Sequence, residues 1–442
     1  MSERWLNMTM ADLGRGIDAG EIDPLALAQS YLDAITAHEM TPRIYARLTE
    51  DRAIAEAQGA SVRAKYGQRR SHLDGVPLSW KDLFDTQGVA TEAGSALLAG
   101  RIPSADARVL RQATLAGTVC LGKTHMSELA FSGLGYNPVT QTSPCVHDID
   151  AVAGGSSSGA AASVAFGLAP GAIGSDTGGS VRVPSAWNDL VGLKTSAGLL
   201  SLDGVVPLAD SFDTVGPLCR SVEDCALALS VLSGAPAPDL RGADLDGMRF
   251  AQLNTVAMDD LRPEPAQAYA DTVARLRAKG VTITQIDVPE VAEAFPLAGI
   301  LYTAEAYGIW RDTIEGAPDK MFPEILARFR AGADFGAVEL SQAWHKLTDL
   351  RRAYHGATAG FDAVIMPSVA NMPPAMTRLA DSDTYVTENL LALRNPRVGN
   401  LMGNCALTIP TGVPSTGIML NAPPRSEARL LRVGRAVERA LA

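Results

Sequence analysis

The N-terminal stretch of the chain alternates apolar and polar positions at the spacing of an α-helix. Its apolar positions are Leu13, Ile17, Ile22, Leu25, Leu27, Tyr31, Leu32 and Ile35, and they predict one or two amphipathic helices over residues 10–37. Downstream, short apolar runs predict strands at 44–48, 76–80, 118–121 and 172–175. The stretches between them predict helices at 51–64, 107–115, 159–166 and 222–232. This alternation favours an α/β fold, with a mixed central β-sheet flanked by helices on both faces.

The pattern changes after residue 234, where the proline-containing stretch 235–239 indicates a joint between two parts of the chain. Three aromatic residues, Tyr302, Tyr307 and Trp310, fit either a pocket wall or a helix packed into the core, and their spacing favours the core. The remaining predicted strands lie at 248–253, 281–286, 363–367, 407–410 and 417–420. The remaining predicted helices lie near 265–279 and 336–356, and from about residue 426 to the C-terminus.

Composition and charge narrow the range of functions. The chain has 442 residues, of which 47% are hydrophobic, and this content is ordinary for a globular enzyme. Its formal net charge of −11 disfavours binding to nucleic acid phosphates and to anionic membranes. The same net charge disfavours a highly acidic substrate, unless a basic pocket overrides it locally.

The five cysteines form no Cys-x-x-Cys pair and no Cys/His cluster with the spacing of a metal site. We therefore expect reduced thiols, a cytoplasmic protein and no bound metal. The N-terminus lacks the basic and apolar regions of a secretory signal, and the longest weakly apolar stretch, 160–173, is too short and too interrupted to span a membrane. No Walker loop and no complete dinucleotide fingerprint occurs, so we expect no cofactor.

One segment is chemically more informative than the rest, Gly174-Ser175-Asp176-Thr177-Gly178-Gly179-Ser180-Val181-Arg182. It follows an apolar run, and its paired glycines let the backbone turn tightly and direct successive N–H groups at one point. A serine hydroxyl beside such donors suits attack on a carbonyl, because the amides hold the oxyanion that forms. Taken alone, the segment fits a plain glycine-rich turn equally well.

Two residues upstream favour a catalytic role for this segment over a plain turn. Ser156 lies in the serine-rich stretch 153–160, and Lys81 follows the strand predicted at 76–80. A lysine can act as a base when burial lowers its pKa, although by itself Lys81 fits better as a solvated lysine or as the ion-pair partner of Asp82. No histidine lies in the serine segments, and no Gly-x-Ser-x-Gly elbow surrounds Ser180. A Ser-His-Asp triad assembled in space stays an alternative, but the pattern favours a lysine base that works through a second hydroxyl.

The segment from Gly75 to Leu218 resembles the amidase signature family of serine hydrolases. The resemblance rests on three motifs in the family's order and spacing: a Val-Pro-x-x-x-Lys-Asp motif, the glycine- and serine-rich stretch 154–159, and the segment 174–182. The stretches 192–196 and 211–218 are similar as well. Ser158 stands where the family often has Gly, and Ala160 where it often has Ser, which leaves the shape of that loop open.

The resemblance implies roles for individual residues. Lys81, Ser156 and Ser180 match the family's catalytic lysine, bridging serine and nucleophile, and in the family a cis peptide precedes the bridging serine. The backbone N–H groups that match the oxyanion hole are those of Thr177, Gly178, Gly179 and Ser180. The supporting candidates are Ser157, which would orient Lys81, Asp176, as a loop cap or a catalytic influence, Arg182, as the partner of Asp176 or a substrate contact, and Ala130, whose carbonyl would face the substrate.

The resemblance also implies an architecture and an activity. We expect one amidase domain over residues 1–442, with a signature core at about 71–232, a variable substrate-entrance region at about 240–400 and a return to the core at about 361–442. The expected reaction is hydrolysis of a linear, non-peptide carboxamide through a serine acyl-enzyme. The alternatives are the amidase subunit of a glutamine-dependent tRNA amidotransferase, a biuret- or ureide-type hydrolase and, least favoured, a non-catalytic anion-binding protein. The expected partner is a small amide, with neither nucleic acid nor membrane, and a homodimer or a small accessory subunit is compatible with this interpretation.

Overall fold

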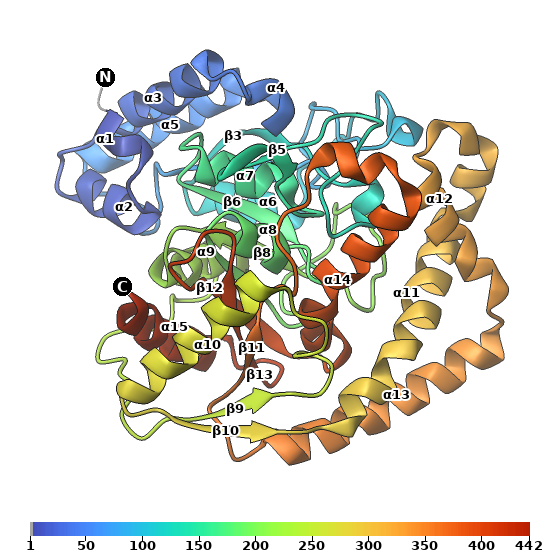
Figure 1. Cartoon of the computed structure of the whole chain (residues 1–442). Coiled ribbons are helices and arrows are strands. Elements are labelled where there is room, and N and C mark those ends of the chain that lie inside the picture. The colour runs from blue at the N-terminus through green and yellow to red at the C-terminus, as the bar shows by residue number, and fades with distance from the viewer. Residues whose placement is uncertain (1–2) are drawn as a thin grey trace.

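The computed structural model describes residues 3–442, and a large β-sheet runs through the middle of this part of the chain (Figure 1). It has 11 strands. In sheet order these are β1 (Tyr45–Leu48), β3 (Val119–Thr124), β2 (Pro77–Lys81), β6 (Gly171–Ser175), β8 (Val215–Cys219), β7 (Val191–Lys194), β12 (Cys405–Pro410), β13 (Gly417–Ala422), β11 (Ala363–Pro367), β9 (Arg249–Leu253) and β10 (Thr282–Ile286). A separate pair consists of β4 (Pro144–Cys145) and β5 (Asp148–Val152).

The sheet is mixed. Strand β2 runs parallel to both of its neighbours, β3 and β6, and β9 runs parallel to β10 and β11. The strands between these two parallel groups, from β6 through β8, β7, β12 and β13 to β11, pair antiparallel in turn. Early and late parts of the chain therefore share one sheet.

Helices pack against this sheet, as the α/β prediction requires, and the predicted fold class is confirmed. They are α1 (Glu3–Leu6), α2 (Met10–Asp18), α3 (Pro24–Ala37), α4 (Thr41–Ile44), α5 (Glu50–Lys65), α6 (Arg108–Leu115), α7 (Ser158–Ala165), α8 (Arg182–Trp187), α9 (Val222–Ser233), α10 (Pro263–Ala278), α11 (Pro289–Gly316), α12 (Pro323–Arg330), α13 (Ala337–Thr358), α14 (Ser382–Leu401) and α15 (Glu427–Leu441). Among the described residues, no helix combines the length and the apolar character needed to cross a membrane.

Two long helices escaped the sequence prediction. Helix α11 contains Pro296 and α14 contains Pro396, and a proline inside a helical pattern normally marks the end of a helix. In Figure 1, α11, α12 and α13 form a layer at one side of the molecule, and α14 lies between that layer and the sheet. Tyr302 and Trp310 of α11 are both buried in the core, as their spacing favoured, and Tyr302 also lines a pocket. Trp310 donates its indole N–H to the carbonyl of Pro207 at 2.9 Å.

Small side chains let α7 approach the sheet closely. All of its residues from Ser158 to Val164 are buried, and it packs on β6. A Cβ atom at Gly159 would lie 2.4 Å from the carbonyl oxygen of Ile44 and 2.8 Å from the amide nitrogen of His125. The loop that leads into α7 is thereby held against β2 and β6, where the candidate residues lie.

A buried ion pair connects the loop after β6 to α14. Arg182 donates from Nε and Nη2 to the two carboxylate oxygens of Asp176 at 3.0 and 2.9 Å, and both side chains are fully buried. Arg182 also donates to the carbonyl of Pro396 at 2.6 Å, and the Asn400 side chain donates to Asp176 at 2.9 Å. Although burial raises the pKa of Asp176, the charge and hydrogen bonds of Arg182 outweigh it and hold the pKa well below its usual range.

We predict that Asp176→Asn destabilises the protein by about 3–5 kcal/mol, because it leaves a buried guanidinium without its counter-charge. The loss is measured as the change in the free energy of unfolding in urea. The matched control is Asp349→Asn, which removes the exposed ion pair of Asp349 with Arg352 and should leave that free energy unchanged. An Asp176→Asn protein as stable as the wild type would contradict the structural role of this pair.

Candidate active site

Three segments meet at the carboxyl ends of β2 and β6. They are the end of β2 itself, the loop before α7 and the loop between β6 and α8. Because β2 and β6 are parallel neighbours, with Ser79 opposite Ala172 and Trp80 opposite Ile173, their last residues emerge side by side. Lys81 therefore lies beside Ser175, and the Nζ atom of Lys81 hydrogen-bonds at 2.7 Å to the Oγ atoms of both Ser175 and Ser156.

Burial changes the acid–base character of Lys81. Its side chain is fully buried, and this desolvation lowers its pKa to about 7, although the negative charges of Asp213 and Asp176 act in the opposite direction. The ion pair with Asp82 that the sequence left open does not form, because Asp82 instead contacts Arg47 at 2.7 Å and Lys123 at 3.2 Å. Near neutral pH, Lys81 therefore exists in large part as an uncharged amine.

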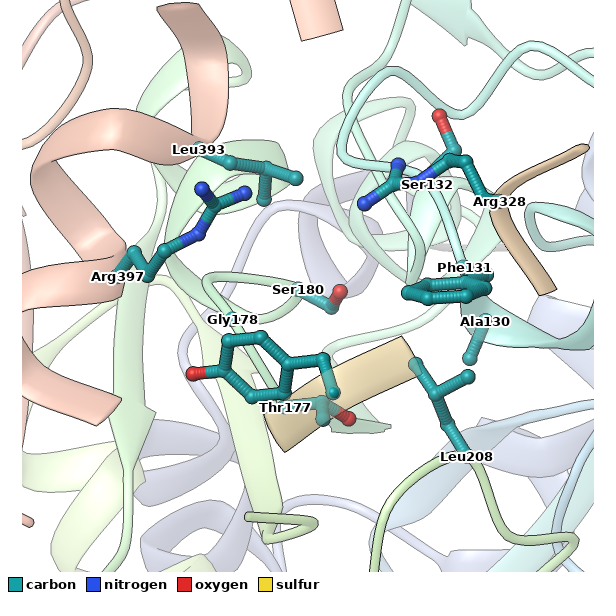
Figure 2. A pocket seen from close by; sticks show the side chains of 11 residues that line it. Ala130, Phe131, Ser132, Thr177, Gly178, Ser180, Leu208, Arg328, Leu393 and Arg397 are labelled. Atoms are coloured by element: carbon teal, nitrogen blue, oxygen red, sulfur yellow. The ribbon is translucent and has the colours of Figure 1, made fainter. Parts of the chain in front are cut away.

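Ser180 lines a pocket beside this group of residues. Figure 2 shows its hydroxyl in the middle of the pocket, and the side chain makes no hydrogen bond with any described residue. The amide of Ser157 donates to the carbonyl of Ser180 at 3.3 Å, so the loop before α7 lies directly beside it. The peptide bond between Gly155 and Ser156 is cis. Lys81 and Ser156 are thus hydrogen-bonded, whereas no hydrogen bond joins Ser156 to Ser180 in this part of the chain.

The backbone amides around Ser180 differ from the sequence prediction in one respect. The N–H groups of Thr177, Gly178 and Ser180 make no hydrogen bond within residues 3–442, as an oxyanion site requires. The N–H of Gly179, which was predicted to join them, donates to the Asp176 carboxylate at 2.9 Å instead. Gly179 itself has a φ of 136°, and a Cβ atom there would lie 2.7 Å from the Cβ of Pro396. The position therefore requires glycine.

Among the other supporting residues, Ser157 has a different contact from the one expected. Ser157 does not hydrogen-bond to Lys81. Its hydroxyl donates to the carbonyl of Ser175 at 3.2 Å and accepts from the amide of Ser175 at 3.3 Å, so Ser175 occupies the place expected for Ser157. Ala130 lines the pocket and has a φ of 60°. Arg182 points into the Asp176 pair described above and is not part of the pocket wall.

Asp213 is a buried carboxyl group that the sequence motif contained without an assigned role. The hydroxyl of Thr177 donates to it, and so do the amides of Leu208 at 2.8 Å and Ala209 at 3.2 Å. Burial raises its pKa to about 6, and these hydrogen bonds limit the increase. Through the hydroxyl of Thr177, Asp213 therefore holds the loop that carries the unpaired amides.

The pocket has apolar walls with two cationic side chains. Its lining includes Phe131, Leu208 and Leu393, and the ring of Tyr302 packs at a tilt against that of Phe212, with centroids 4.4 Å apart. Arg328 of α12 and Arg397 of α14 also line it. Sequence reasoning missed both arginines, because neither lies in a recognisable motif and α14 itself was not predicted. No group of three or more His, Cys, Asp or Glu residues suited to a metal ion occurs in the described part of the chain.

Comparison with known proteins shows the family to which the chain belongs. The amidase family model matches residues 26–431. The chain is 34% identical to 2-amino-5-chloromuconic acid deaminase of Comamonas testosteroni, covering 98% of this chain and 96% of that protein. It is 30% identical to a glutamyl-tRNA(Gln) amidotransferase subunit of Chloroflexus aggregans, again over 98% and 96%. A crystal structure of an amidase superposes with a TM-score of 0.89 at 28% identity, covering 98% of this chain and all of that one. The chain belongs to the amidase signature family.

Proposed function

We propose that this protein hydrolyses the C–N bond of a small carboxamide, with Ser180 as nucleophile, Ser156 as proton relay and Lys81 as base. Membership of the amidase family supports an amidohydrolase. The observation that carries the finer proposal is the position of Lys81: a fully buried amine with a pKa of about 7, hydrogen-bonded to Ser156 and to no carboxylate of the described chain.

In the proposed reaction, neutral Lys81 accepts the hydroxyl proton of Ser156, and Ser156 accepts that of Ser180. The Ser180 oxygen forms a bond to the amide carbonyl carbon, and the carbonyl electrons move to the oxygen. The free N–H groups of Thr177, Gly178 and Ser180 stabilise this oxyanion by hydrogen bonding. The protonated lysine returns its proton through Ser156 to the leaving nitrogen, the C–N bond breaks, and the amine leaves.

An acyl group then remains on Ser180. Water attacks the ester carbonyl, and the same lysine and serine accept its proton and return it to the Ser180 oxygen. The products are a carboxylic acid and ammonia or an amine. The hydrogen bond that Ser180 donates to Ser156 must form when substrate enters, because catalytic hydrogen bonds are often long or absent in the unliganded site.

The alternative of an amidotransferase subunit shares this chemistry but passes ammonia to a partner. It has support in the likeness to glutamyl-tRNA(Gln) amidotransferase subunits. The two functions separate on one measurement, the release of ammonia from a simple amide by the isolated chain. Hydrolysis that depends on no added protein favours the stand-alone amidase.

We predict that Ser180→Ala lowers the rate of ammonia release by at least about a thousandfold, because the covalent intermediate is lost. A fluorophosphonate probe should label the wild type at residue 180 and leave this variant unlabelled. The matched control is Ser185→Ala in α8, a buried serine whose hydroxyl has no hydrogen-bond partner in the described chain. Wild-type turnover in a pure, folded Ser180→Ala protein would refute the nucleophile.

We predict that kcat/KM rises with pH around an apparent pKa of about 7, the pKa of Lys81. Lysine is a base only when unprotonated, so kcat/KM should fall about tenfold for each pH unit below that value and level off above it. Lys81→Met should abolish activity across the range, with circular dichroism confirming the fold. A wild-type profile that stays flat from about pH 5.5 to 8.5 is incompatible with this base.

A further inference from the structure

Two guanidinium groups enter the pocket that contains Ser180. Arg328 projects from α12 and Arg397 from α14, and Figure 2 shows them reaching from opposite sides toward the space beside the Ser180 hydroxyl. The empty space of the pocket, counted to its open mouth, is about 330 Å³. This figure includes space that is open to solvent, so the enclosed part is smaller and any ligand held within it is small.

Neither arginine has a counter-charge within residues 3–442. They form no ion pair there, and the Nη1 atom of Arg328 and the Nε atom of Arg397 are buried without a hydrogen-bond partner. Burial lowers the pKa of Arg328 to about 10, with the nearby charge of Arg397 contributing, and it lowers the pKa of Arg397 as well. Both groups nevertheless stay protonated at neutral pH, so two positive charges share one small space.

Two other arginines are paired with buried carboxylates. Arg182 has Asp176 as its partner, and Arg63 contacts Asp74 at 2.6 Å. At the pocket, aromatic support comes from the Phe131 ring, whose centroid lies 4.4 Å from the guanidinium carbon of Arg328. An unpaired charge in an apolar wall costs free energy because it has lost its hydration. A bound anion that accepts hydrogen bonds from both guanidinium groups would remove that cost.

Three acidic residues near the pocket are engaged with other groups, whereas Glu324, one turn before Arg328 on α12, forms no ion pair with it and has a buried Oε2 atom without a hydrogen-bond partner among the described residues. Asp176 is paired with Arg182, and Asp213 accepts from Thr177 and from two backbone amides. Glu128 accepts from the hydroxyl of Ser95 and from the amide of Phe322. In the described chain, no Asp or Glu is among the residues that line the pocket. A ligand ammonium group would therefore meet two like charges and no carboxylate.

We propose that the substrate is a small amide that carries a carboxylate, such as the monoamide of a dicarboxylic acid, and that Arg328 and Arg397 bind this carboxylate while the amide carbonyl lies at Ser180. This proposal rests on the proposed hydrolysis at Ser180. It excludes neutral amides as preferred substrates. It also disfavours glutamine, whose α-ammonium group has no acidic partner here. The reaction converts the monoamide and water to a dicarboxylate and ammonium.

The first test compares substrates that differ only in the carboxylate. Succinamate is paired with succinamide, glutaramate with glutaramide, and L-glutamine is assayed alongside, each by ammonia release. We expect kcat/KM to be at least about a hundredfold higher for each acid than for its neutral amide, since charge-assisted bidentate contacts are strong. Equal kcat/KM values within each pair, or a preference for glutamine, would overturn the proposal.

The second test uses variants. Arg328→Gln and Arg397→Gln should each lower kcat/KM for succinamate by about 10- to 100-fold and leave that for succinamide within about threefold. The matched controls are Arg330→Gln on α12, which pairs with Glu315 at the surface, and Arg394→Gln on α14, which lies outside the pocket lining. A loss of the same factor on both substrates would assign the arginines to structure and contradict the proposal.

The third test does not depend on turnover. Calorimetry measures the binding of succinate and of inorganic phosphate to the Ser180→Ala protein, with and without each arginine substitution. Succinate should bind, and Arg328→Gln or Arg397→Gln should abolish its binding. Absence of succinate binding, or phosphate binding as tight as that of succinate, would refute a carboxylate site. Hydrolysis of neutral amides without succinate binding would sink this inference alone, whereas succinate binding without hydrolysis of any amide would sink the proposed function alone.

Discussion

The site depends on a lysine amine that is buried among hydroxyl groups. An ammonium ion loses its hydration on burial, and the usual remedy is an adjacent carboxylate, which would also keep the amine protonated. Here the neighbouring Asp82 is held by Arg47 and Lys123, while Asp213 and Asp176 act on Lys81 only at a distance. Lys81 is left with two serine hydroxyls, which can accept from an ammonium or donate to an amine. The position of β2 between two parallel neighbours fixes this arrangement.

The arginines near the site fall into two groups, according to whether a carboxylate of the protein balances their charge. Arg182, bound to Asp176 and to the carbonyl of Pro396, closes its hydrogen bonds within the protein and ties the Ser180 loop to α14. Arg328 and Arg397 line the pocket, and each has a guanidinium nitrogen without a hydrogen-bond partner among the described residues. The first kind of contact stabilises the fold, because removing either partner leaves an unpaired charge in the core. The second kind leaves a charge without a partner, and in a pocket beside Ser180, the proposed nucleophile, a bound anion would supply that partner.

The features that could be predicted from the sequence are those encoded locally. The strands that end at Lys81 and Ser175, the glycine-rich turn at Ser180 and the pairing of Asp176 with Arg182 all depend on short spacings. The contact of Ser175 with Lys81 needs the register of two parallel strands, which no local pattern shows. The amide of Gly179 was assigned to the oxyanion hole, but the carboxylate of Asp176, three residues earlier, accepts its hydrogen bond. Whether the amide binds this carboxylate or stays free depends on the geometry of the loop, which the sequence does not show.

The wall of the pocket that contains Ser180 could not be predicted, for a different reason. Prolines 296 and 396 interrupt the patterns of α11 and α14, which supply Tyr302 and Arg397 to the pocket, and neither helix was predicted. The eight-residue helix α12, which carries Arg328, was not predicted either. Without those helices nothing distinguishes Arg328 and Arg397 from the many arginines that face solvent. No carboxylate of the described chain forms an ion pair with either arginine, and the positions that the carboxylates take in the fold cannot be read from the sequence.

The net charge of −11 also has to be weighed against this pocket. Taken as a whole, it disfavours an acidic substrate. Charges spread over the surface are screened by salt within about 8–10 Å, however, whereas two guanidinium groups in an apolar cavity act on a ligand at contact and through a lower effective dielectric. If the two arginines bind a carboxylate as proposed, the surface charge influences the rate at which an anion approaches, and the arginines determine whether it stays bound. For a ligand class, the local balance of buried charges is the better guide than the sum over the chain.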